Sequence, residues 1–156
     1  MGTTSSIDFP TTFDCYDSTF NGGSPTFMTS GLGVNYNNGS DLFITHLSND
    51  GANLLGSTYM GGSDNDGLNS TSSVAVNNIL RYNYADEIRG EIEIDDNNNI
   101  YVGSCSKSID FPTTSTAFQS SFGGGDLDGC IFKFDNSLQN LISVSYTHLT
   151  LPTMLM

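Results

Sequence analysis

Two short acidic turns carry the residues with the clearest potential for chemistry. Residues 63–67 (SDNDG) and 125–129 (GDLDG) each place two carboxylates at positions i and i+2 before a glycine. A hard cation such as Ca²⁺ takes several oxygen ligands from one tight turn, so this spacing could hold calcium. Neither turn has the later bidentate glutamate of an EF-hand loop, and capping of the turn by its own Asp side chains explains the same pattern. The candidate calcium ligands are Asp64, Asp66, Asp126 and Asp128.

Paired carboxylates could also hydrolyse a glycosidic bond, which needs two acidic groups at a suitable separation. Glu91 with Glu93 and Asp95 with Asp96 are further pairs of this kind. Glu91 and Glu93 alternate with isoleucines, so they share one face of a strand and form a solvated row more readily than a catalytic dyad. No GxSxG turn accompanies the serines, so Ser-His-Asp catalysis is not expected. We therefore expect no enzymatic activity and no cofactor, with calcium as the one ion the chain could bind.

Histidine and cysteine add no further candidate site. Of the two histidines, His46 is expected to face solvent, because the equivalent position of an internal repeat holds Lys133. The three cysteines, Cys15, Cys105 and Cys130, are an odd number without ligand spacing. We expect Cys130 to be a small core residue in a strand, and we expect no disulfide.

The internal repeat identifies the elements that position these residues. Residues 6–23 (SIDFPTTFDCYDSTFNGG) and 108–125 (SIDFPTTSTAFQSSFGGG) are identical at 11 of 18 positions without a gap. After an insertion the register resumes, because residues 41–47 (DLFITHL) align with residues 128–134 (DGCIFKF). The period of a repeat usually determines its architecture, so we expect two copies of one structural unit.

Alternation and flanking turns predict four extended runs in one unit, at residues 42–47, 54–60, 88–95 and 100–104. Residues 88–94 have isoleucines at positions 88, 92 and 94 and polar residues between the last two, an alternation typical of a strand with one buried face. The Asp and Asn residues at 95–99 are expected to close a hairpin. Two antiparallel pairs would give one four-stranded sheet per unit, whose apolar face neighbouring units must cover. The expected fold is all-β: a β-propeller fragment of about one and a half four-stranded antiparallel blades.

The two IDFPTT segments have a structural explanation. Pro10 and Pro112 cannot donate to a sheet ladder, and the adjacent Phe9 and Phe111 can bury between blades. We therefore interpret these segments as packing anchors.

Charge and hydropathy restrict the partners. The chain of 156 residues carries 17 Asp and Glu against 4 Lys and Arg, a net charge of −13. Such a surface repels nucleic acid and anionic membranes. There is neither a run of about 18 apolar residues nor a basic and apolar leader after Met1, so no membrane insertion and no signal peptide are expected in this fragment. The expected partners are other blades of the same parent chain and a protein or glycan ligand.

Four segments together resemble a known family. The series SIDFPTT, AFQSSFGGGDLDGCIFKF, NLLGSTYMGGSDNDG and GEIEIDDNNNIYVGSCSKS resembles the bacterial SBBP family, the seven-bladed β-propeller repeat of large exported and cell-surface proteins. The resemblance covers nearly all of residues 2–143 and departs from the family pattern at insertions near 24–40 and 68–85. It implies a non-enzymatic scaffold or binding module at an extracellular or cell-surface location, with no known catalytic residues. The alternative is part of a propeller hydrolase or lyase that acts on polysaccharide with acidic residues from several blades.

These observations divide the chain into four parts. Residues 1–20 are expected to be the end of a preceding blade and a connector, residues 21–106 one four-stranded blade with the two insertions, and residues 107–143 the start of the next blade. Residues 144–153 (VSYTHLTLPT) match one reading frame of a common sequencing adapter. We therefore interpret residues 144–156 as a probable sequencing-adapter artefact, not native protein. If the parent protein is exported, its signal peptide is expected upstream of this fragment.

Overall fold

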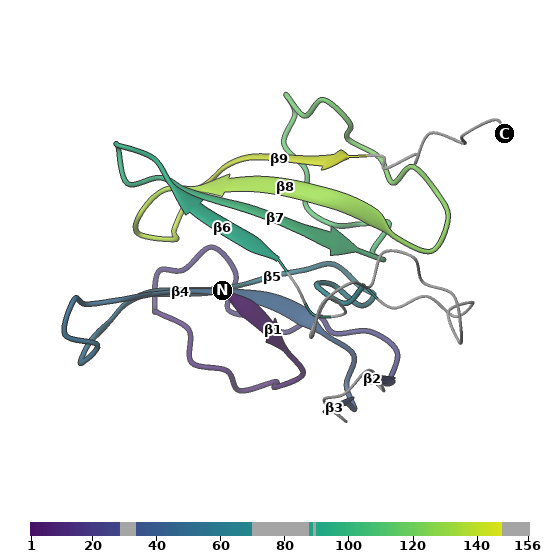
Figure 1. Ribbon diagram of the computed structural model, residues 1–156, viewed down its shortest axis with the longest axis horizontal. Coiled ribbons are helices and arrows are strands. Elements are labelled where there is room, and N and C mark those ends of the chain that lie inside the picture. Colours follow the sequence, from purple (N-terminus) through teal and green to yellow (C-terminus); the bar gives the residue numbers. More distant parts are fainter. Residues whose placement is uncertain (29–33, 70–87, 89, 148–156) are drawn as a thin grey trace, which may run out of the picture.

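The computed structural model of the protein describes residues 1–28, 34–69, 88 and 90–147. Within these residues the chain is all-β, as predicted, and the named strands pair antiparallel in three sheets. Figure 1 shows the two larger sheets one above the other. None of the described residues forms a helix with the length and apolarity that crossing a bilayer requires.

Each of the three sheets is built from short strands. The first sheet has the order β1-β4-β5, with β1 at Gly2–Thr4, β4 at Asp41–Leu47 and β5 at Leu54–Met60. The second sheet follows chain order, with β6 at Glu91–Ile94, β7 at Ile100–Ser106, β8 at Asp128–Phe134 and β9 at Leu141–Thr147. The third is a small hairpin of β2 (Thr26–Met28) and β3 (Val34–Tyr36), which lies inside the insertion predicted at 24–40.

The predicted runs correspond closely to strands, but their grouping into one sheet is wrong. Runs 42–47, 54–60 and 100–104 fall within β4, β5 and β7, whereas the run 88–95 contains only the four-residue β6. β4 and β5 belong to the first sheet, and β6 and β7 belong to the second. The reason is that β7 pairs with β8 along its whole length. Each sheet therefore joins the last strands of one repeat copy to the first strands of the next.

The first sheet repeats the pairing of the second. Thr4 of β1 lies opposite Asp41 of β4, as Ser106 of β7 lies opposite Asp128 of β8. β1 thus occupies the position of β7, and the assignment of residues 1–20 to the end of a preceding blade stays a prediction. The predicted insertion at 68–85 lies outside the described residues beyond residue 69, as does the tail beyond residue 147. Residues 144–147 of the segment interpreted as an adapter product continue β9, where Tyr146 aligns with Tyr59 of the first copy. We therefore treat these four residues as part of the repeat, and the adapter origin of the segment stays a prediction.

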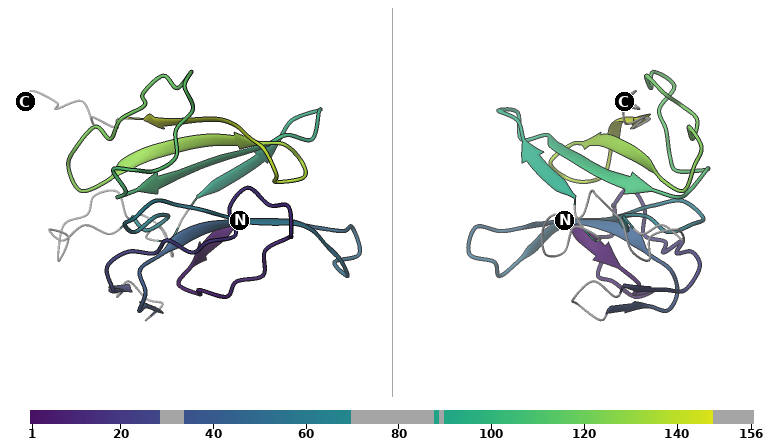
Figure 2. Two further views of the ribbon diagram at one scale, coloured as in Figure 1. Left: turned by 180° about the vertical axis from the view of Figure 1, so that it is seen from behind. Right: turned by 45° about the vertical axis from the view of Figure 1, so that its right-hand side comes forward.

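Figure 2 shows the two larger sheets stacked on each other. A hydrophobic core fills the space between them. It uses opposite faces of the two copies, because Ile44 of β4 is fully buried while its equivalent in β8, Ile131, is 52% exposed. Conversely, Cys130 is buried in this core, as predicted, whereas its equivalent Phe43 packs on Phe9 at the other face of the first sheet. The two sheets therefore stack head to tail, which means that one face of the first sheet packs on the opposite face of the second. The main core residues are Leu42, Ile44, Met60, Ile100, Val102, Phe111, Cys130, Phe132, Phe134, Leu138, Val144 and Tyr146.

The predicted buried face of residues 88–94 is wrong for β6. Ile92 and Ile94 share a face with their cross-strand partners Val102 and Ile100, yet both are exposed, Ile94 to 65%. β6 is the edge strand of the second sheet, and among the described strands the first sheet has no equivalent of β6 to cover it. A cavity of about 330 Å³ opens at this place, lined chiefly by isoleucines of β4, β6 and β7.

Candidate functional site

The most polar part of the interior is the junction where the first repeat unit meets the second copy of the SIDF sequence. The segment at residues 61–67, which we call the acidic loop, leaves β5 and runs beside the end of β7. Gly67 N–H donates to the Cys105 carbonyl at 2.8 Å, and Lys107 N–H donates to the Asn65 carbonyl at 3.0 Å. Asp66 forms an isolated antiparallel bridge with Ser106. The backbone of the loop is therefore fixed to the strand by sheet-like hydrogen bonds.

Asp66 is the buried centre of this junction. Its Oδ2 accepts hydrogen bonds from Gly62 N–H at 2.7 Å and from the Ser108 hydroxyl at 2.9 Å. Burial raises the pKa of Asp66 to about 7, and the nearby charge of Asp41 also raises it. Hydrogen bonds from Ser106, Gly62 and Ser108 lower this pKa but do not offset the effect of burial. This carboxyl group is therefore held close to its protonation midpoint at neutral pH.

Asp41, at the start of β4, is a second buried carboxylate beside Asp66. It accepts N–H groups from Asn21 at 2.7 Å and from Gly22 at 3.0 Å. Burial raises its pKa to about 6, although these two backbone hydrogen bonds oppose the shift. Gly61 separates the two acids, since a Cβ there would lie 2.5 Å from Asp41 Oδ1 and 3.0 Å from Asp66 Oδ2. Sequence reasoning missed Asp41, although its alignment with the candidate Asp128 was an available signal.

The four candidate calcium ligands do not converge. In each turn one carboxylate points inward and is buried, namely Asp66 and Asp128, while its partner is partly or fully exposed, namely Asp64 and Asp126. Within residues 1–28, 34–69, 88 and 90–147, no group of three or more His, Cys, Asp or Glu side chains could hold a metal ion. Calcium binding therefore stays a prediction.

Turn capping, in contrast, is directly visible. Asp64 accepts the N–H of Asn65 at 2.8 Å, Asp66 that of Gly62, and Asp128 that of Gly123. Asp41 and Asp128 cap equivalent turns in the two copies. Each side chain accepts hydrogen bonds from backbone N–H groups of the glycine-containing turn that ends the repeated segment. The capping interpretation is confirmed for these side chains.

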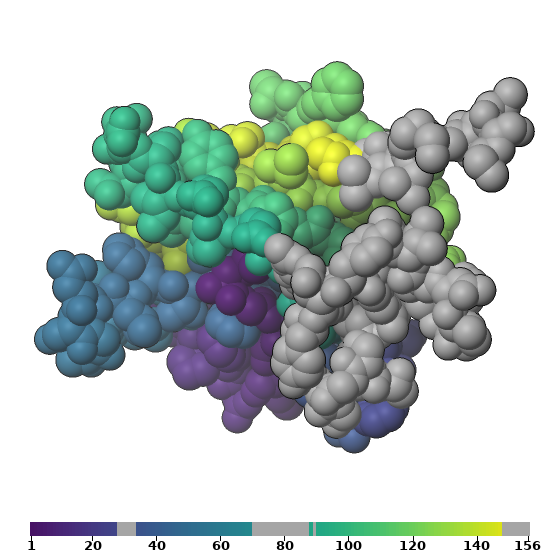
Figure 3. Space-filling model, viewed as in Figure 1, coloured from purple at the N-terminus to yellow at the C-terminus, as the bar shows by residue number. Residues whose placement is uncertain are grey.

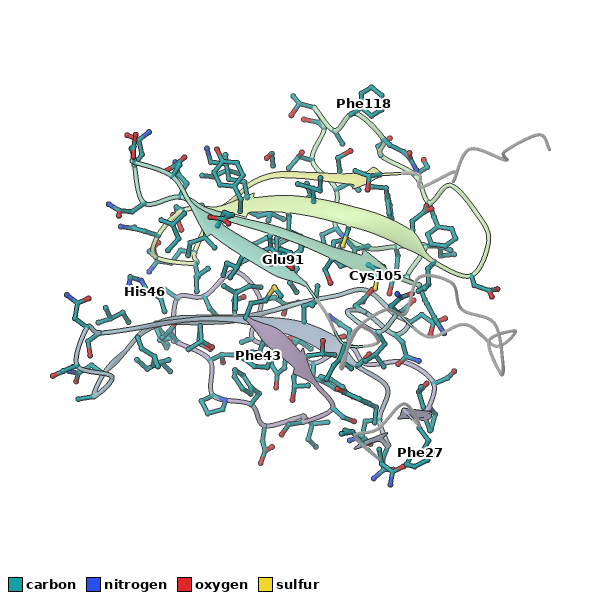
Figure 4. The ribbon with its side chains drawn as sticks, viewed as in Figure 1. Phe27, Phe43, His46, Glu91, Cys105 and Phe118 are labelled. Carbon is teal, nitrogen blue, oxygen red and sulfur yellow. The ribbon has the colours of Figure 1, made fainter. Side chains whose placement is uncertain are left out.

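The other candidate groups do not take part in the contacts of Asp41 and Asp66. Glu91 and Glu93 are exposed on the outer face of the second sheet, as predicted, with Glu93 opposite Tyr101. His46 is half-buried, and its Nδ1 lies 3.0 Å from the Asn136 carbonyl oxygen. Figure 4 shows His46 apart from Glu91 and Cys105, which belong to the neighbouring strands β6 and β7. No acid, base and nucleophile are brought together by these described residues.

All three cysteines are free, as expected. Burial raises the pKa of Cys130 well above its usual range, so this thiol stays protonated at neutral pH. A buried protonated thiol behaves as a small apolar group and carries no nucleophilic chemistry.

The two SIDF segments make the same contacts with equivalent tyrosines. The Tyr59 hydroxyl donates to the Ser6 carbonyl at 2.8 Å and accepts the Phe9 N–H at 2.9 Å. Tyr146 does the same with the Ser108 carbonyl at 2.5 Å and the Phe111 N–H at 3.1 Å. The rest of each segment follows the free edge of the last strand. Its carbonyl groups at Asp17 and Gln119 accept the Tyr59 and Tyr146 N–H groups, both at 3.0 Å.

Phe111 acts as the predicted packing anchor. Its ring is 3% exposed and lies against Phe132 and Tyr146, with ring centroids 6.1 and 6.2 Å apart. Phe9 packs on Phe43 and Tyr59 in the corresponding way but is only partly buried. The repeated residues are thus used for packing and for backbone hydrogen bonds.

Comparison of the chain with protein-family models, curated proteins and solved structures found no match. The class that the fold itself defines is an all-β protein with two antiparallel sheets stacked head to tail.

Proposed function

We propose that this chain is part of a non-enzymatic repeat scaffold of the β-propeller type, from a secreted or cell-surface bacterial protein similar to the SBBP family. The observation that carries the proposal is the set of hydrogen bonds that the two SIDFPTT copies share. In both copies the tyrosine hydroxyl donates to the Ser carbonyl and accepts the Phe N–H, an arrangement that we call the tyrosine lock. The Asp that follows in each copy caps the glycine-containing turn. Residues repeated for structure rather than for reaction are the expected signature of a scaffold.

The stacking of the sheets supports a propeller-type arrangement. Head-to-tail packing uses two different faces of one unit, so the contact can be repeated until a ring closes or a stack extends. The second sheet is a four-stranded antiparallel meander in chain order, which is the strand order of a propeller blade.

The acidic pair at the junction is poorly suited to the alternative function, polysaccharide hydrolysis or lysis. Asp41 and Asp66 have the raised pKa values that a general acid needs. Both side chains are nevertheless fully buried and already accept backbone N–H groups. A general acid must lie within hydrogen-bond distance of the oxygen it protonates, and no substrate oxygen can reach these carboxylates.

A ligand of such a scaffold would meet the hairpin tips. The turns at 48–53, 95–99 and 135–140 lie at one end of the molecule, and Figure 3 shows the first two projecting there in blue and teal. Each is held by an Asp side chain that accepts backbone N–H groups: Asp50 from Ala52, Asp95 from Asn97 and Asn99, and Asp135 from Gln139 and Asn140. Rigid polar tips of this kind suit hydrogen bonding to a glycan or a protein surface.

Turnover and ligand binding together test the proposal. We expect no product from a panel of polysaccharides, measured as released reducing ends or unsaturated sugars, with a known hydrolase as positive control. Any turnover that Asp64→Ala or Asp126→Ala abolishes would defeat the scaffold function. A ligand found on a glycan array should bind more weakly after Asn49→Ala and Asn97→Ala at the tips, and should be unaffected by Asp64→Ala.

A further inference from the structure

The acidic loop and the second SIDF segment form an interface that is already occupied within the chain. Ser63 N–H and its hydroxyl donate to Asp110 Oδ1 at 2.8 and 3.0 Å, and Asp64 N–H donates to the Ser108 hydroxyl oxygen at 2.9 Å. The hydrogen bonds from Ser63 hold the pKa of Asp110 below its usual value. The loop is therefore recognised by one hydroxyl group and one carboxylate that stand two residues apart.

Gly62 makes this approach possible. A Cβ at this position would lie 2.5 Å from Ser108 Cβ and 2.6 Å from Asp110 Oδ1, which real structures do not tolerate. The contact thus selects a loop with glycine directly before the serine.

The first copy presents the same acceptor on the surface. Residues 6–9, which we call the SIDF ledge, repeat residues 108–111 in sequence and in their hydrogen bonds to a tyrosine. Here the Ser6 hydroxyl donates to Asp8 Oδ1 at 2.5 Å, and both Ile7 and Asp8 are exposed. Phe9 is only partly buried, unlike its counterpart Phe111. Asp8 and Ser6 therefore satisfy each other at the place where Asp110 and Ser108 bind the acidic loop.

We propose that the SIDF ledge is the docking site for a Gly-Gly-Ser-Asp-Asn-Asp-Gly loop of another repeat unit. This inference rests on the proposed repeat scaffold and names the partner that one of its end faces takes. The argument is continuity with the interface inside the chain, because the ledge offers the same hydroxyl and carboxylate at the same spacing. The acidic loop of the same unit cannot fill it, since that loop is bound to Ser108 and Asp110.

A peptide titration on the full chain tests the proposal in trans. The probe is a synthetic peptide of residues 59–69, and the readout is the shift of backbone amide signals in nuclear magnetic resonance spectra. We expect shifts at residues 6–9, and a loss of affinity of about tenfold for the Asp8→Ala protein because charge-assisted hydrogen bonds are removed. A peptide with the Gly62→Ala change should give no shifts at the ledge. Shifts confined to other residues would overturn the proposal.

A tandem chain tests the same contact at high effective concentration. Residues 1–104 followed directly by residues 3–156 preserve the repeat spacing, because residue 6 aligns with residue 108. In this tandem, Asp8→Ala of the second unit should lower the urea midpoint as much as Asp110→Ala does in the single chain. In the single chain, Asp8→Ala should leave the midpoint almost unchanged.

The combined outcomes decide the proposal. If the tandem tolerates Asp8→Ala as well as the single chain does, and the peptide leaves residues 6–9 unshifted, the docking site is excluded. If the tandem chain does not unfold cooperatively, the peptide titration alone decides the proposal. Turnover of a polysaccharide would defeat the proposed function without affecting either measurement, so the two failures are distinguishable.

Discussion

At the scale of single residues, the fold uses its acidic groups mainly as acceptors for backbone N–H groups. Asp41, Asp64, Asp66 and Asp128 all serve turns in this way. The buried ones are costly to ionise, because burial removes water from the charged form. Their protonation should therefore be linked to folding.

Asp66→Asn should flatten the pH dependence of stability. The pKa of Asp66 is raised from its ordinary value of 3.8 to about 7 by burial, so the folded protein binds a proton more tightly than the unfolded chain. The stabilisation is fully present below about pH 4 and is lost as the pH rises through 7, which amounts to a change on the order of 4 kcal/mol. The measurement is urea unfolding of both proteins between pH 4 and pH 8.

Asp64→Asn is the matched control, because this side chain lies in the same loop and is only partly buried. It should keep the slope of the wild-type protein. Equal slopes for the wild-type protein and Asp66→Asn would show that Asp66 is ionised throughout this range.

Tyr59→Phe should destabilise the protein by about 1–2 kcal/mol, since it leaves the Phe9 N–H and the Ser6 carbonyl without their partner. The free energy of unfolding can be measured by urea denaturation. Tyr16→Phe, which removes the hydroxyl of a partly exposed ring, should cost much less. Similar losses in the two variants would argue against the tyrosine lock.

At the scale of elements, each SIDFPTT segment is a connection, which we call a strap, that packs on the last strand of its sheet. That strand is β5 in the first sheet and β9 in the second. The strap places a Phe ring over the tyrosine of the sheet and then follows the free edge of the strand. Strand edges with unpaired N–H and C=O groups promote aggregation, so a strap of this kind also protects the sheet.

Phe111→Ala should cost about 3–5 kcal/mol, because a large buried ring is replaced by a cavity between the sheets. Phe118 lies later in the same 18-residue repeat, at residues 108–125, but is 97% exposed, so Phe118→Ala should change stability by less than about 0.5 kcal/mol. Chemical denaturation of the two variants is the comparison. A small loss for Phe111→Ala would mean that the Phe111 ring is not a packing anchor of the core.

At the scale of the whole molecule, a net charge of −13 dominates. Like charges repel one another most in the compact state, and salt screens this repulsion. The head-to-tail stacking leaves one face of each larger sheet turned outward, so the surface combines strong negative charge with apolar positions such as Ile131.

The melting temperature should therefore rise with NaCl concentration. If the Asp turns act only as caps, CaCl₂ at equal ionic strength should raise the melting temperature by the same amount. A chelator should then lower the melting temperature by no more than the loss of ionic screening does. A larger effect of Ca²⁺ that disappears with Asp64→Ala and Asp126→Ala would establish the calcium site instead. Differential scanning calorimetry with MgCl₂ as control separates the two outcomes.

The sequence by itself determined the local elements of this protein. The alternation of apolar residues located β4, β5 and β7, and the 18-residue repeat located the two straps, because side-chain period and turn composition are local properties. Likewise, the solvated position of Glu91 and Glu93 and the buried position of Cys130 follow from neighbours on the same strand.

Only the tertiary structure decided which strands share a sheet and which carboxylates are buried. β7 pairs with β8 rather than closing a sheet with β4 and β5, and Ile94 stays exposed because, among the described strands, the first sheet has no equivalent of β6 to pack against it. Asp41 and Asp66 are 25 residues apart and meet beside Gly61 only when the loop folds back over β4. Such contacts depend on chain segments that are distant in sequence, and local pattern contains no information about their pairing.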